Sequence, residues 1–452
     1  MTGKTLFVAN RGEIAVRINR AAKALGMTVA QAHSEADAEM LAVKLADKAV
    51  CVGPAQATKS YLDAGRVVAA ALEAGADAVH PGYGFLAENA DFAAAVEAAG
   101  LIFVGPSPDT IRRMGDKVAA RAAAKAAGVP TAPGSEGRLE GAAAAQAAAE
   151  AVGYPVMIKA AAGGGGRGIR VAETAEDLAR LVPQAEAEAR AAFGDGGLYL
   201  ERLITDARHV EVQVLGDGTR AIHLWERECS LQRRRQKVWE EAPAACLDAD
   251  TRDKLCASAV RLAETVGYRG AGTLEYLYDA RTGDFHFLEM NTRIQVEHPV
   301  TEMVTGVDLI AEMIRIAFGE PLRIAQADVA LSGHAIEVRV NAEDPANGFM
   351  PFPGVVGAMA VPEGVRFDTM LYEGYAIPPF YDSLLGKLIV HGETRAAALE
   401  KLRAAIAGMR LDGLKTTLPL HAALARDPDV IAGRTHTRWL EQWLETATIE
   451  AA

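Results

Sequence analysis

The sequence predicts an α/β domain followed by domains of the α+β type, and three observations support this fold class. From Lys4 to Gly105, short apolar runs alternate with helical patterns. From Asp116, an Ala-rich stretch leads into short strands joined by turn signals, and a third pattern begins near Gly333. A chain of 452 residues suits about three domains. We expect these domains at residues 1–115, 116–332 and 333–447.

The first region is typical of a parallel sheet with helices on both faces, because strands and helices alternate along it. A helix is expected from Glu13 to Leu25, and strands are expected at Thr5–Ala9, Thr28–His33, Val50–Gly53, Ala78–His80 and Leu101–Gly105. Ligands of such sheets lie beyond the carboxyl ends of the strands. Two strand-exit segments, ANRGE at 9–13 and HPGYG at 80–84, are therefore candidate parts of a site.

The later regions follow different patterns. The Ala-rich stretch predicts a helix, a linker and a second helix between Asp116 and about Gly153. Turn signals such as Asp217-Gly218 favour antiparallel pairing of the strands expected at Pro155–Ala161, Ile169–Ala172, Leu198–Ile204, Val210–Leu215 and Ala221–Trp225. The third region predicts a strand over GHAIEVRVNAED and helices over Arg395–Gly408 and Thr435–Thr446.

The composition is that of a globular chain with an acidic balance. Lys plus Arg is 47 and Asp plus Glu is 59, so the net charge is −12. The four cysteines have no C-x-x-C spacing, the N-terminus lacks a signal-peptide pattern, and no apolar window approaches about 18 residues. We therefore expect a cytoplasmic protein whose main partner is neither a nucleic acid nor a membrane. The basic run from Gln232 to Lys237 then indicates a solvated charge cluster rather than a nucleic-acid contact.

A glycine-rich segment from Lys159 to Gly168 lies between two expected strands. Its glycines let backbone N–H groups approach phosphate oxygens, and Lys159 and Arg167 add positive charge. It is not a Walker motif, because no Gly-Lys-Ser/Thr opens a helix there. The position favours a flap over phosphates, and a flexible hairpin loop is the alternative.

Glu275, Glu289 and Asn291 form a second constellation. The segments around 274–276 and 287–291 are expected to pair as strands, and Glu289 and Asn291, two residues apart, share a face. Three oxygen ligands would then converge, as Mg²⁺ prefers when nucleotide phosphates complete its shell. The alternative is a pair of hairpin strands with solvent-facing polar side chains.

Arg293, Gln295 and Glu297 follow directly. Alternation in an extended segment would place them on one side and Ile294 and Val296 on the other. The guanidinium would orient a small oxyanion while the carboxylate took a proton from it. An exposed, salt-bridged strand is the alternative.

Taken together, the motifs resemble the signature segments of the biotin carboxylase family. They occur in the family's order from about residue 4 to residue 445 as ANRGEIAVRI, HPGYGFLAEN, FVGPS, MGDK, KAAAGGGGRG, RHVEVQV, QRRRQKV, GYRGAGTLEY, EMNTRIQVEHPVTE, GHAIEVRVNAEDP and YDSLLGKL. The resemblance implies an ATP-grasp fold with an N-terminal Rossmann-like domain, a C-terminal biotin carboxylase domain and a glycine-rich lid over about 131–204.

The resemblance also assigns residues to substrates. For ATP it implies Lys117, Lys159, Gly164, Gly165, Gly166, Arg167, Gly168, Glu201, Leu203, Ile204, His209, Gln232, Glu275, Leu277 and Glu289. For Mg²⁺ or Mn²⁺ it implies Glu275, Glu289 and Asn291. For bicarbonate and biotin it implies Tyr83, Lys237, Arg293, Gln295, Val296, Glu297 and Arg339.

In the implied reaction, Glu297 deprotonates bicarbonate while Lys237 and Arg293 hold the anion, and attack on ATP gives carboxyphosphate. Carboxyphosphate then breaks into carbon dioxide and phosphate, the phosphate removes a proton from biotin, and Arg339 stabilises the biotin enolate. Three positions depart from the family pattern. Arg235 stands where a histidine near the ribose is usual, Ala162 replaces a glycine, and Arg202 replaces a common lysine.

The resemblance has consequences for partners. No Ala-Met-Lys-Met segment is present, since the nearest match, Gly357 to Val361, has no lysine. We therefore expect a separate biotin carboxyl carrier protein and separate carboxyltransferase subunits, those of acetyl-CoA carboxylase first. Another acyl-CoA, urea, a 2-oxo acid or a lactam is the alternative final acceptor, and an ATP-binding regulatory homologue without turnover is a further alternative. Arg17 and Asp382 match positions that imply a homodimer.

Overall fold

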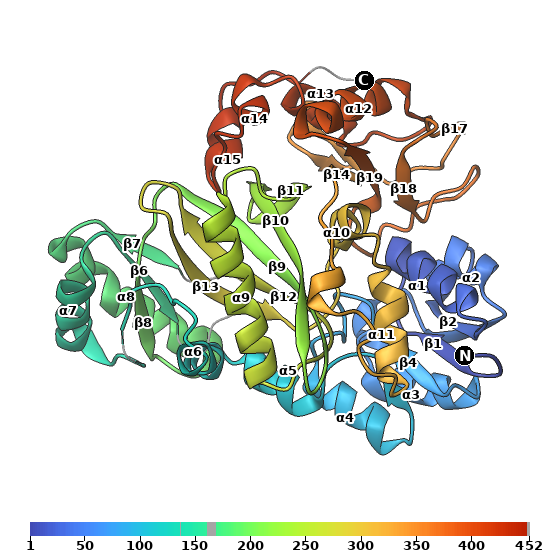
Figure 1. The fold of residues 1–452 in the computed structure, drawn as a ribbon, viewed down its shortest axis with the longest axis horizontal. Helices are drawn as coiled ribbons and strands as arrows, with labels where there is room; N and C mark the ends of the chain where they lie inside the picture. Colours follow the sequence, from blue (N-terminus) through green and yellow to red (C-terminus); the bar gives the residue numbers. More distant parts are fainter. Residues whose placement is uncertain (136, 161–168, 450–452) are drawn as a thin grey trace.

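A computed structural model describes residues 1–135, 137–160 and 169–449 of the chain (Figure 1). The N-terminal part holds a parallel sheet of five strands in the order β3-β2-β1-β4-β5. These strands are β1 (Thr5–Val8), β2 (Thr28–Ser34), β3 (Lys48–Gly53), β4 (Ala78–His80) and β5 (Ile102–Phe103). The helices are α1 (Gly12–Ala24), α2 (Leu41–Leu45), α3 (Ala64–Glu73), α4 (Ala90–Ala98) and α5 (Pro108–Gly115). The parallel sheet predicted for this region is confirmed.

An antiparallel sheet of eight strands forms the centre of the molecule, in the order β13-β12-β9-β10-β11-β14-β19-β18. Its strands are β9 (Ala207–Asp217), β10 (Ala221–Arg233), β11 (Gln236–Ala242), β12 (Arg269–Asp279), β13 (Asp284–Asn291), β14 (His334–Asn341), β18 (Arg366–Thr369) and β19 (Leu384–Gly392). Trp239 of β11 pairs with Val338 of β14. The sheet therefore runs without interruption across the boundary expected at 332/333, which itself stays a prediction.

A smaller sheet, β7-β6-β8, forms a separate lobe at the left of Figure 1. It comprises β6 (Val156–Ala160), β7 (Arg170–Ala172) and β8 (Leu198–Arg202), covered by α7 (Gly141–Val152) and α8 (Ala175–Phe193). Its apolar side chains form a cluster of their own, from Ala145 to Leu200. The backbone N–H of Arg202 donates to the carbonyl of Pro133 over 2.8 Å, so the chain enters and leaves the lobe at adjacent points.

The remaining elements surround the central sheet. The helices are α6 (Lys117–Ala126), α9 (Ala249–Thr265), α10 (His298–Thr305), α11 (Leu309–Ala317), α12 (Arg395–Gly408), α13 (Leu418–Leu424), α14 (Pro428–Ile431) and α15 (Trp439–Leu444). Short 3-10 turns occur at Glu35–Asp37, Ala57–Lys59, Gln326–Asp328 and Pro345–Asn347. Two-residue strands pair as β15 (Glu343–Asp344) with β16 (Met350–Pro351), and as β17 (Met359–Ala360) with β20 (Arg410–Leu411).

Two predicted elements differ most in extent from the structure. The strand predicted at Ala221–Trp225 continues to Arg233. The predicted strand was too short because Trp225 adopts a left-handed conformation (φ 65°) at a bulge, which breaks the alternation of the sequence there. The helix predicted over Thr435–Thr446 is wrong at its start and covers only Trp439–Leu444. There the N–H of Thr437 donates to the carbonyl of Ala207 over 3.0 Å, so a tertiary contact holds the backbone outside a helix.

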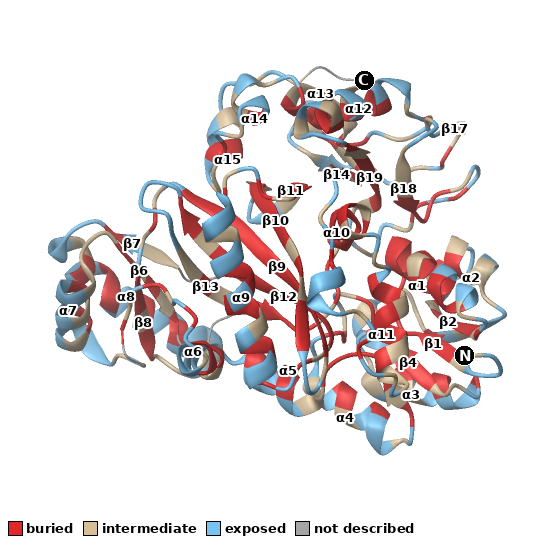
Figure 2. Ribbon diagram, viewed as in Figure 1, coloured by how far each residue is buried: buried red, intermediate tan, exposed pale blue. Residues whose placement is uncertain are grey.

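Buried residues are concentrated along the central strands and the helices that face them (Figure 2). The largest apolar cluster runs from Leu6 of the first sheet through Trp239 to Leu440 near the C-terminus. The N-terminal, central and C-terminal parts therefore share one core. Among the described helices, none combines the length and the apolar character needed to cross a bilayer.

Candidate active site

Two adjoining cavities lie beside the central sheet. The first, of about 460 Å³, is lined by every residue predicted for bicarbonate, biotin or metal: Tyr83, Lys237, Glu275, Glu289, Asn291, Arg293, Gln295, Val296, Glu297 and Arg339. The second, of about 530 Å³, is lined by the residues predicted for ATP that the structure describes: Lys117, Lys159, Glu201, Leu203, Ile204, His209, Gln232, Glu275, Leu277 and Glu289. The structure does not describe residues 161–168, which include the predicted ATP-binding residues Gly164, Gly165, Gly166, Arg167 and Gly168. Ala162, which replaces a glycine of the family pattern, lies in the same range.

The two cavities share His209, Gln232, Arg235, Glu275 and Glu289, so they adjoin at these residues. Arg234 and Arg235 make the turn between β10 and β11, and both adopt left-handed conformations (φ 49° and 65°). Arg235, which replaces the family's usual histidine, therefore lies with Gln232 where the two cavities adjoin. The second departure, Arg202, is exposed at the end of β8.

Lys237 is the centre of charge in the first cavity. Its Nζ lies 2.6 Å from Glu211 Oε2, 2.9 Å from Glu275 Oε1 and 2.7 Å from Glu297 Oε1. Burial opposes the ammonium charge, but the three carboxylates outweigh burial and raise the pKa of Lys237 well above its usual value. Lys237 therefore stays charged and holds three acidic side chains from three different segments at one point.

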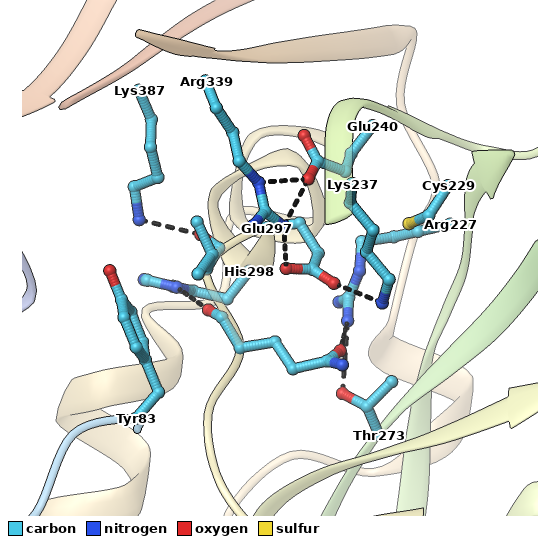
Figure 3. Close-up of polar contacts among 12 residues, drawn as sticks. Tyr83, Arg227, Cys229, Lys237, Glu240, Thr273, Glu297, His298, Arg339 and Lys387 are labelled. Atoms are coloured by element: carbon cyan, nitrogen blue, oxygen red, sulfur yellow. Dashed lines mark hydrogen bonds and ion pairs between the residues drawn. The ribbon is translucent and has the colours of Figure 1, made fainter. Parts of the chain in front are cut away.

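Arg339, from β14, lies on the other side of Glu297 (Figure 3). Its Nη2 lies 3.0 Å from Glu297 Oε2, and its Nε donates to Glu240 Oε1 over 2.7 Å. Burial of Glu297 opposes its ionisation, but Lys237 and Arg339 outweigh burial and hold the pKa of this carboxyl below its usual value. Glu297 is thus an ionised carboxylate fixed between two cations.

The segment that carries Arg293, Gln295 and Glu297 is not the uniformly extended strand that the alternation predicts. It turns at Val296 and Glu297, and Glu297 is the N-cap of α10 (φ −80°, ψ 7°). Pro299 at the start of α10 and the buried ammonium of Lys387, which donates to the Val296 carbonyl over 2.8 Å, fix this turn. The three predicted side chains nevertheless line the same cavity.

The predicted metal ligands lie on one face of the β12–β13 pair. Glu275 is opposite Glu289 in the register, and Asn291 Nδ2 donates to Glu275 Oε1 over 2.9 Å. Burial and the neighbouring Glu275 raise the pKa of Glu289, and among the described residues no cation pairs with Glu289. Mg²⁺ prefers such a set of oxygen ligands, which consists of two adjacent carboxylates and an amide oxygen. Its charge would also neutralise Glu289, which has no counterion among the described residues.

In the second cavity, Glu201 of β8 joins three side chains. It forms an ion pair with Lys159, accepts a hydrogen bond from the Tyr199 hydroxyl, and lies 3.1 Å from Nη1 of Arg121. His209 Nε2 lies 3.3 Å from Glu275 Oε2, and this carboxylate outweighs burial and raises the pKa of His209 to about 9. Lys159, predicted to bind phosphate, and Glu201, predicted to lie beside the adenine, are thus in direct contact.

The two strand-exit segments of the N-terminal sheet line a separate hollow of about 140 Å³, and only Tyr83 of these segments also lines the first cavity. Asn10 Nδ2 donates to the carbonyls of Pro81 (2.6 Å) and Tyr83 (2.7 Å). Gly82 lies in the left-handed region (φ +63°), and a Cβ there would lie 2.9 Å from Asn10 Nδ2, so the turn requires glycine. The Tyr83 hydroxyl donates to the buried Glu13, which also pairs with Lys387 at 3.1 Å.

Four residues around the site were not anticipated from the sequence, namely Glu211, Arg227, Glu240 and Lys387. Glu211 and Arg227 are fully buried within strands β9 and β10. Glu211 lies in the alternating run Val-Glu-Val-Gln-Val, a pattern that also fits a strand with a solvent-facing polar side, so no local signal marks it as buried. The positions implied for dimer formation are separate: Arg17 pairs with Glu302 (2.8 Å) and Asp308 (2.6 Å), whereas the exposed Asp382 lies at the rim of the first cavity.

Comparison with family models covers most of the chain. Residues 2–111 match the model of the biotin carboxylase N-terminal domain, and residues 337–442 match that of the biotin carboxylase C-terminal domain. Residues 116–325 match the ATP binding domain of the carbamoyl-phosphate synthase L chain.

Individual proteins agree with these matches. The chain is 54% identical over 443 residues to the biotin carboxylase of Pseudomonas aeruginosa, covering 97% of this chain and 98% of that protein. It superposes on a biotin carboxylase–ATP complex from Campylobacter jejuni with a TM-score of 0.92 at 45% identity, over 97% and 98% of the two chains. For the biotin carboxylase domain dimer of a 2-oxoglutarate carboxylase from Hydrogenobacter thermophilus, bound to MgADP, ADP and bicarbonate, the TM-score is 0.91 at 46% identity over both full chains.

Proposed function

The chain belongs to the biotin carboxylase family, and we propose from this premise that it carboxylates biotin on a separate carrier protein through carboxyphosphate, with Glu297 as the base. It is an ATP-dependent ligase of the ATP-grasp superfamily that uses Mg²⁺, bicarbonate and biotin. The observation that supports the residue roles best is the position of Glu297 between Lys237 and Arg339.

The first step is activation of bicarbonate. Lys237 and Arg293 would hold the anion in the first cavity while Glu297 takes its proton. The deprotonated oxygen then attacks the γ-phosphate of ATP in the adjoining cavity, forming the C–O–P link of carboxyphosphate and releasing ADP. Lys237 and Arg339 lower the basicity of Glu297, but the same cations also stabilise the carbonate dianion that forms when bicarbonate loses its proton.

The nucleotide would be held by Lys117 and Lys159 at its phosphates and by Glu201, Leu203 and Ile204 at its base. Glu275, Glu289 and Asn291 would hold Mg²⁺, which neutralises phosphate charge. The lining residues that the two cavities share support this division, because the γ-phosphate has to meet bicarbonate where the cavities adjoin.

In the second step carboxyphosphate breaks into carbon dioxide and phosphate. The phosphate removes the ureido N–H proton of biotin, and the resulting enolate oxygen needs a fixed cation, which Arg339 would provide beside Tyr83. The carbon dioxide then forms the N–C bond of carboxybiotin.

The test is phosphate release by the purified chain with Mg²⁺, ATP and bicarbonate, with and without free biotin, for the wild type and Glu297→Gln. We expect biotin-stimulated phosphate release and carboxybiotin from the wild type. The variant should lose turnover by about 10²- to 10⁴-fold, as expected for removal of a general base, and still bind ATP. Unchanged turnover in Glu297→Gln would exclude Glu297 as the base.

We further propose that the acceptor system is acetyl-CoA carboxylase, with a separate carrier and carboxyltransferase. The support is that the relatives from Pseudomonas aeruginosa and Bacillus subtilis, at 54% and 49% identity, are named biotin carboxylase, whereas the biotin carboxylase chains of a pyruvate carboxylase and a 2-oxoglutarate carboxylase match at 46% identity. Labelled bicarbonate, supplied with carrier and carboxyltransferase subunits from the same genome, should enter acetyl-CoA. Labelling of another acyl-CoA, urea, a lactam or a 2-oxo acid instead would identify the alternative acceptor.

A homodimer is the proposed assembly. The support is a surface hollow of about 360 Å³ that brings together Arg17, Arg20, Arg366, Glu302, Asp308 and Asp368. A mass near twice 47.7 kDa in light scattering is the expected result, and Arg17→Glu should shift the mass toward the monomer.

A further inference from the structure

Arg339 has a second carboxylate partner that the proposed mechanism does not use. Its Nε and Nη2 face Glu240 Oε1, at 2.7 Å and 2.5 Å, while Nη2 also reaches Glu297 Oε2 at 3.0 Å (Figure 3). Among the described residues no group accepts a hydrogen bond from Nη1. Arg339 lines the first cavity, so Nη1 remains for a substrate oxygen.

The position of Glu240 is fixed by the sheet. Glu240 of β11 is paired in register with Glu337 of β14, and Arg339 lies two residues beyond Glu337 on the same face. Glu240 and Glu337 are both fully buried. The same hydrogen-bond ladder therefore holds both Glu240 and the backbone of Arg339.

Glu240 and Glu337 differ in their partners. Glu240 meets Arg339, whereas among the described residues neither carboxyl oxygen of Glu337 has a hydrogen-bond partner. Burial raises the pKa of Glu337 well above its usual value, and burial raises the pKa of Glu240 to about 7 against the opposing effect of Arg339. Both pKa values are raised, so it is the geometry that distinguishes the two carboxyls. Glu240 Oε1 accepts hydrogen bonds from the Arg339 guanidinium, which stabilises a negative charge on Glu240, whereas Glu337 has no such partner among the described residues and is the neutral member of the pair.

We propose that Glu240 is a positioning residue for the biotin half-reaction, which keeps the Arg339 guanidinium aimed at biotin after Glu297 has taken up its proton. This inference rests on the proposed function. Once Glu297 is protonated, Arg339 loses one of its two anionic partners and would be free to turn away from the cavity wall. Glu240 remains as its counterion, holds Nε and Nη2, and leaves Nη1 directed at the enolate oxygen.

The test compares Glu240→Gln with Glu337→Gln, which is a matched control because it changes a buried carboxyl on the paired position. Two rates are measured for each: bicarbonate-dependent ATP hydrolysis without biotin, which reports formation of carboxyphosphate, and carboxybiotin formation with free biotin. For Glu240→Gln we expect the ratio of the second rate to the first to fall about 10- to 100-fold, as for loss of a charged hydrogen bond. For Glu337→Gln the ratio should stay within about twofold of the wild type, because that carboxyl is already neutral.

A parallel fall of both rates in Glu240→Gln, or equal ratios in the two variants, would overturn the proposal and leave a structural role. If Glu240→Gln does not fold, Glu240→Asp keeps the charge but withdraws it by one methylene group. Its ratio should then lie below that of the wild type, and an unchanged ratio would also overturn the proposal. A wild type without biotin-dependent turnover would instead refute the proposed function itself, so the two failures are distinguishable.

Discussion

At the scale of single residues, Arg227 shows how a buried charge organises the site. Its side chain is fully buried and donates to five groups: Glu211, Gln213, Thr273, Gln295 and Thr301, at 2.7 to 3.2 Å. These groups come from β9, β12, the segment between β13 and α10, and α10. Because every N–H direction of the guanidinium is used, Arg227 fixes Gln295 relative to the sheet without itself lining the cavity.

We expect Arg227→Lys to lower the free energy of unfolding by about 3 kcal/mol, since an ammonium cannot replace the planar set of donors and leaves buried oxygens unpaired. The KM for bicarbonate should rise, because Gln295 loses its anchor. Urea denaturation and bicarbonate titration measure the two effects. Arg112→Lys, at a surface ion pair whose arginine is 56% exposed, is the control and should change neither. A stable variant with unchanged KM would contradict the role given to Arg227.

The sequence predicted those site residues whose chemistry is visible in local patterns. Glu275, Glu289 and Asn291 follow from paired strands with a shared face, and the structure pairs those strands. Arg227, Glu211 and Glu240 could not be predicted in the same way, because their partners lie on strands or loops far along the chain and only the fold brings them together.

At the scale of elements, departures from the predicted secondary structure occur where tertiary contacts override local pattern. The bulge at Trp225 ends the alternation that predicts a strand, although hydrogen bonding continues to Arg233. The turn at Val296 and Glu297 is fixed partly by Lys387, which is distant in sequence. Strand β11 shows the same principle at its end, where Glu241 binds Arg395 of α12 (2.6 Å) and His334 of β14 (2.9 Å).

Glu241 gives a pH-dependent prediction. Burial opposes its charge, but hydrogen bonds from His334 and Arg395 outweigh burial and lower its pKa to about 2. Its contribution to stability is therefore complete above the unfolded pKa near 4.5 and is lost as the pH falls toward 2. The difference in unfolding free energy between the wild type and Glu241→Gln should narrow by about 1 kcal/mol between pH values of roughly 6 and 3.5. Urea titrations measure it, and a constant difference would refute the assignment.

At the scale of the whole molecule, the largest of the five apolar clusters among the described residues is shared between domains, and one lobe has a cluster of its own. The large apolar cluster joins the N-terminal sheet, the central sheet and the C-terminal helices. The lobe around β6, β7 and β8 is connected at Pro133 and Arg202, whose backbones are hydrogen bonded. The lobe and the rest of the molecule are therefore expected to differ in how far they fold independently.

We expect a chain in which residues 134–201 are replaced by a short Gly-Ser linker to remain folded but to lose ATP affinity, because Lys159 and Glu201 are removed. A chain ending at residue 332 should not fold, because β11 would lose its neighbour β14 and the shared core would be opened. Circular dichroism with thermal melting, together with nucleotide binding, distinguishes the two. A cooperative melt of the fragment 1–332 would contradict the shared core.

The pairing of β11 with β14 also fixes how far apart two cationic residues of the site are held. Lys237 and Arg339 are carried by these two neighbouring strands, and Glu297 contacts both side chains. The spacing of their backbone positions is set by the hydrogen bonds of the sheet and not by the position of the lobe relative to the central sheet. Movement of the lobe that carries Lys159 and Glu201 would therefore leave the distance between the backbone positions of Lys237 and Arg339 unchanged.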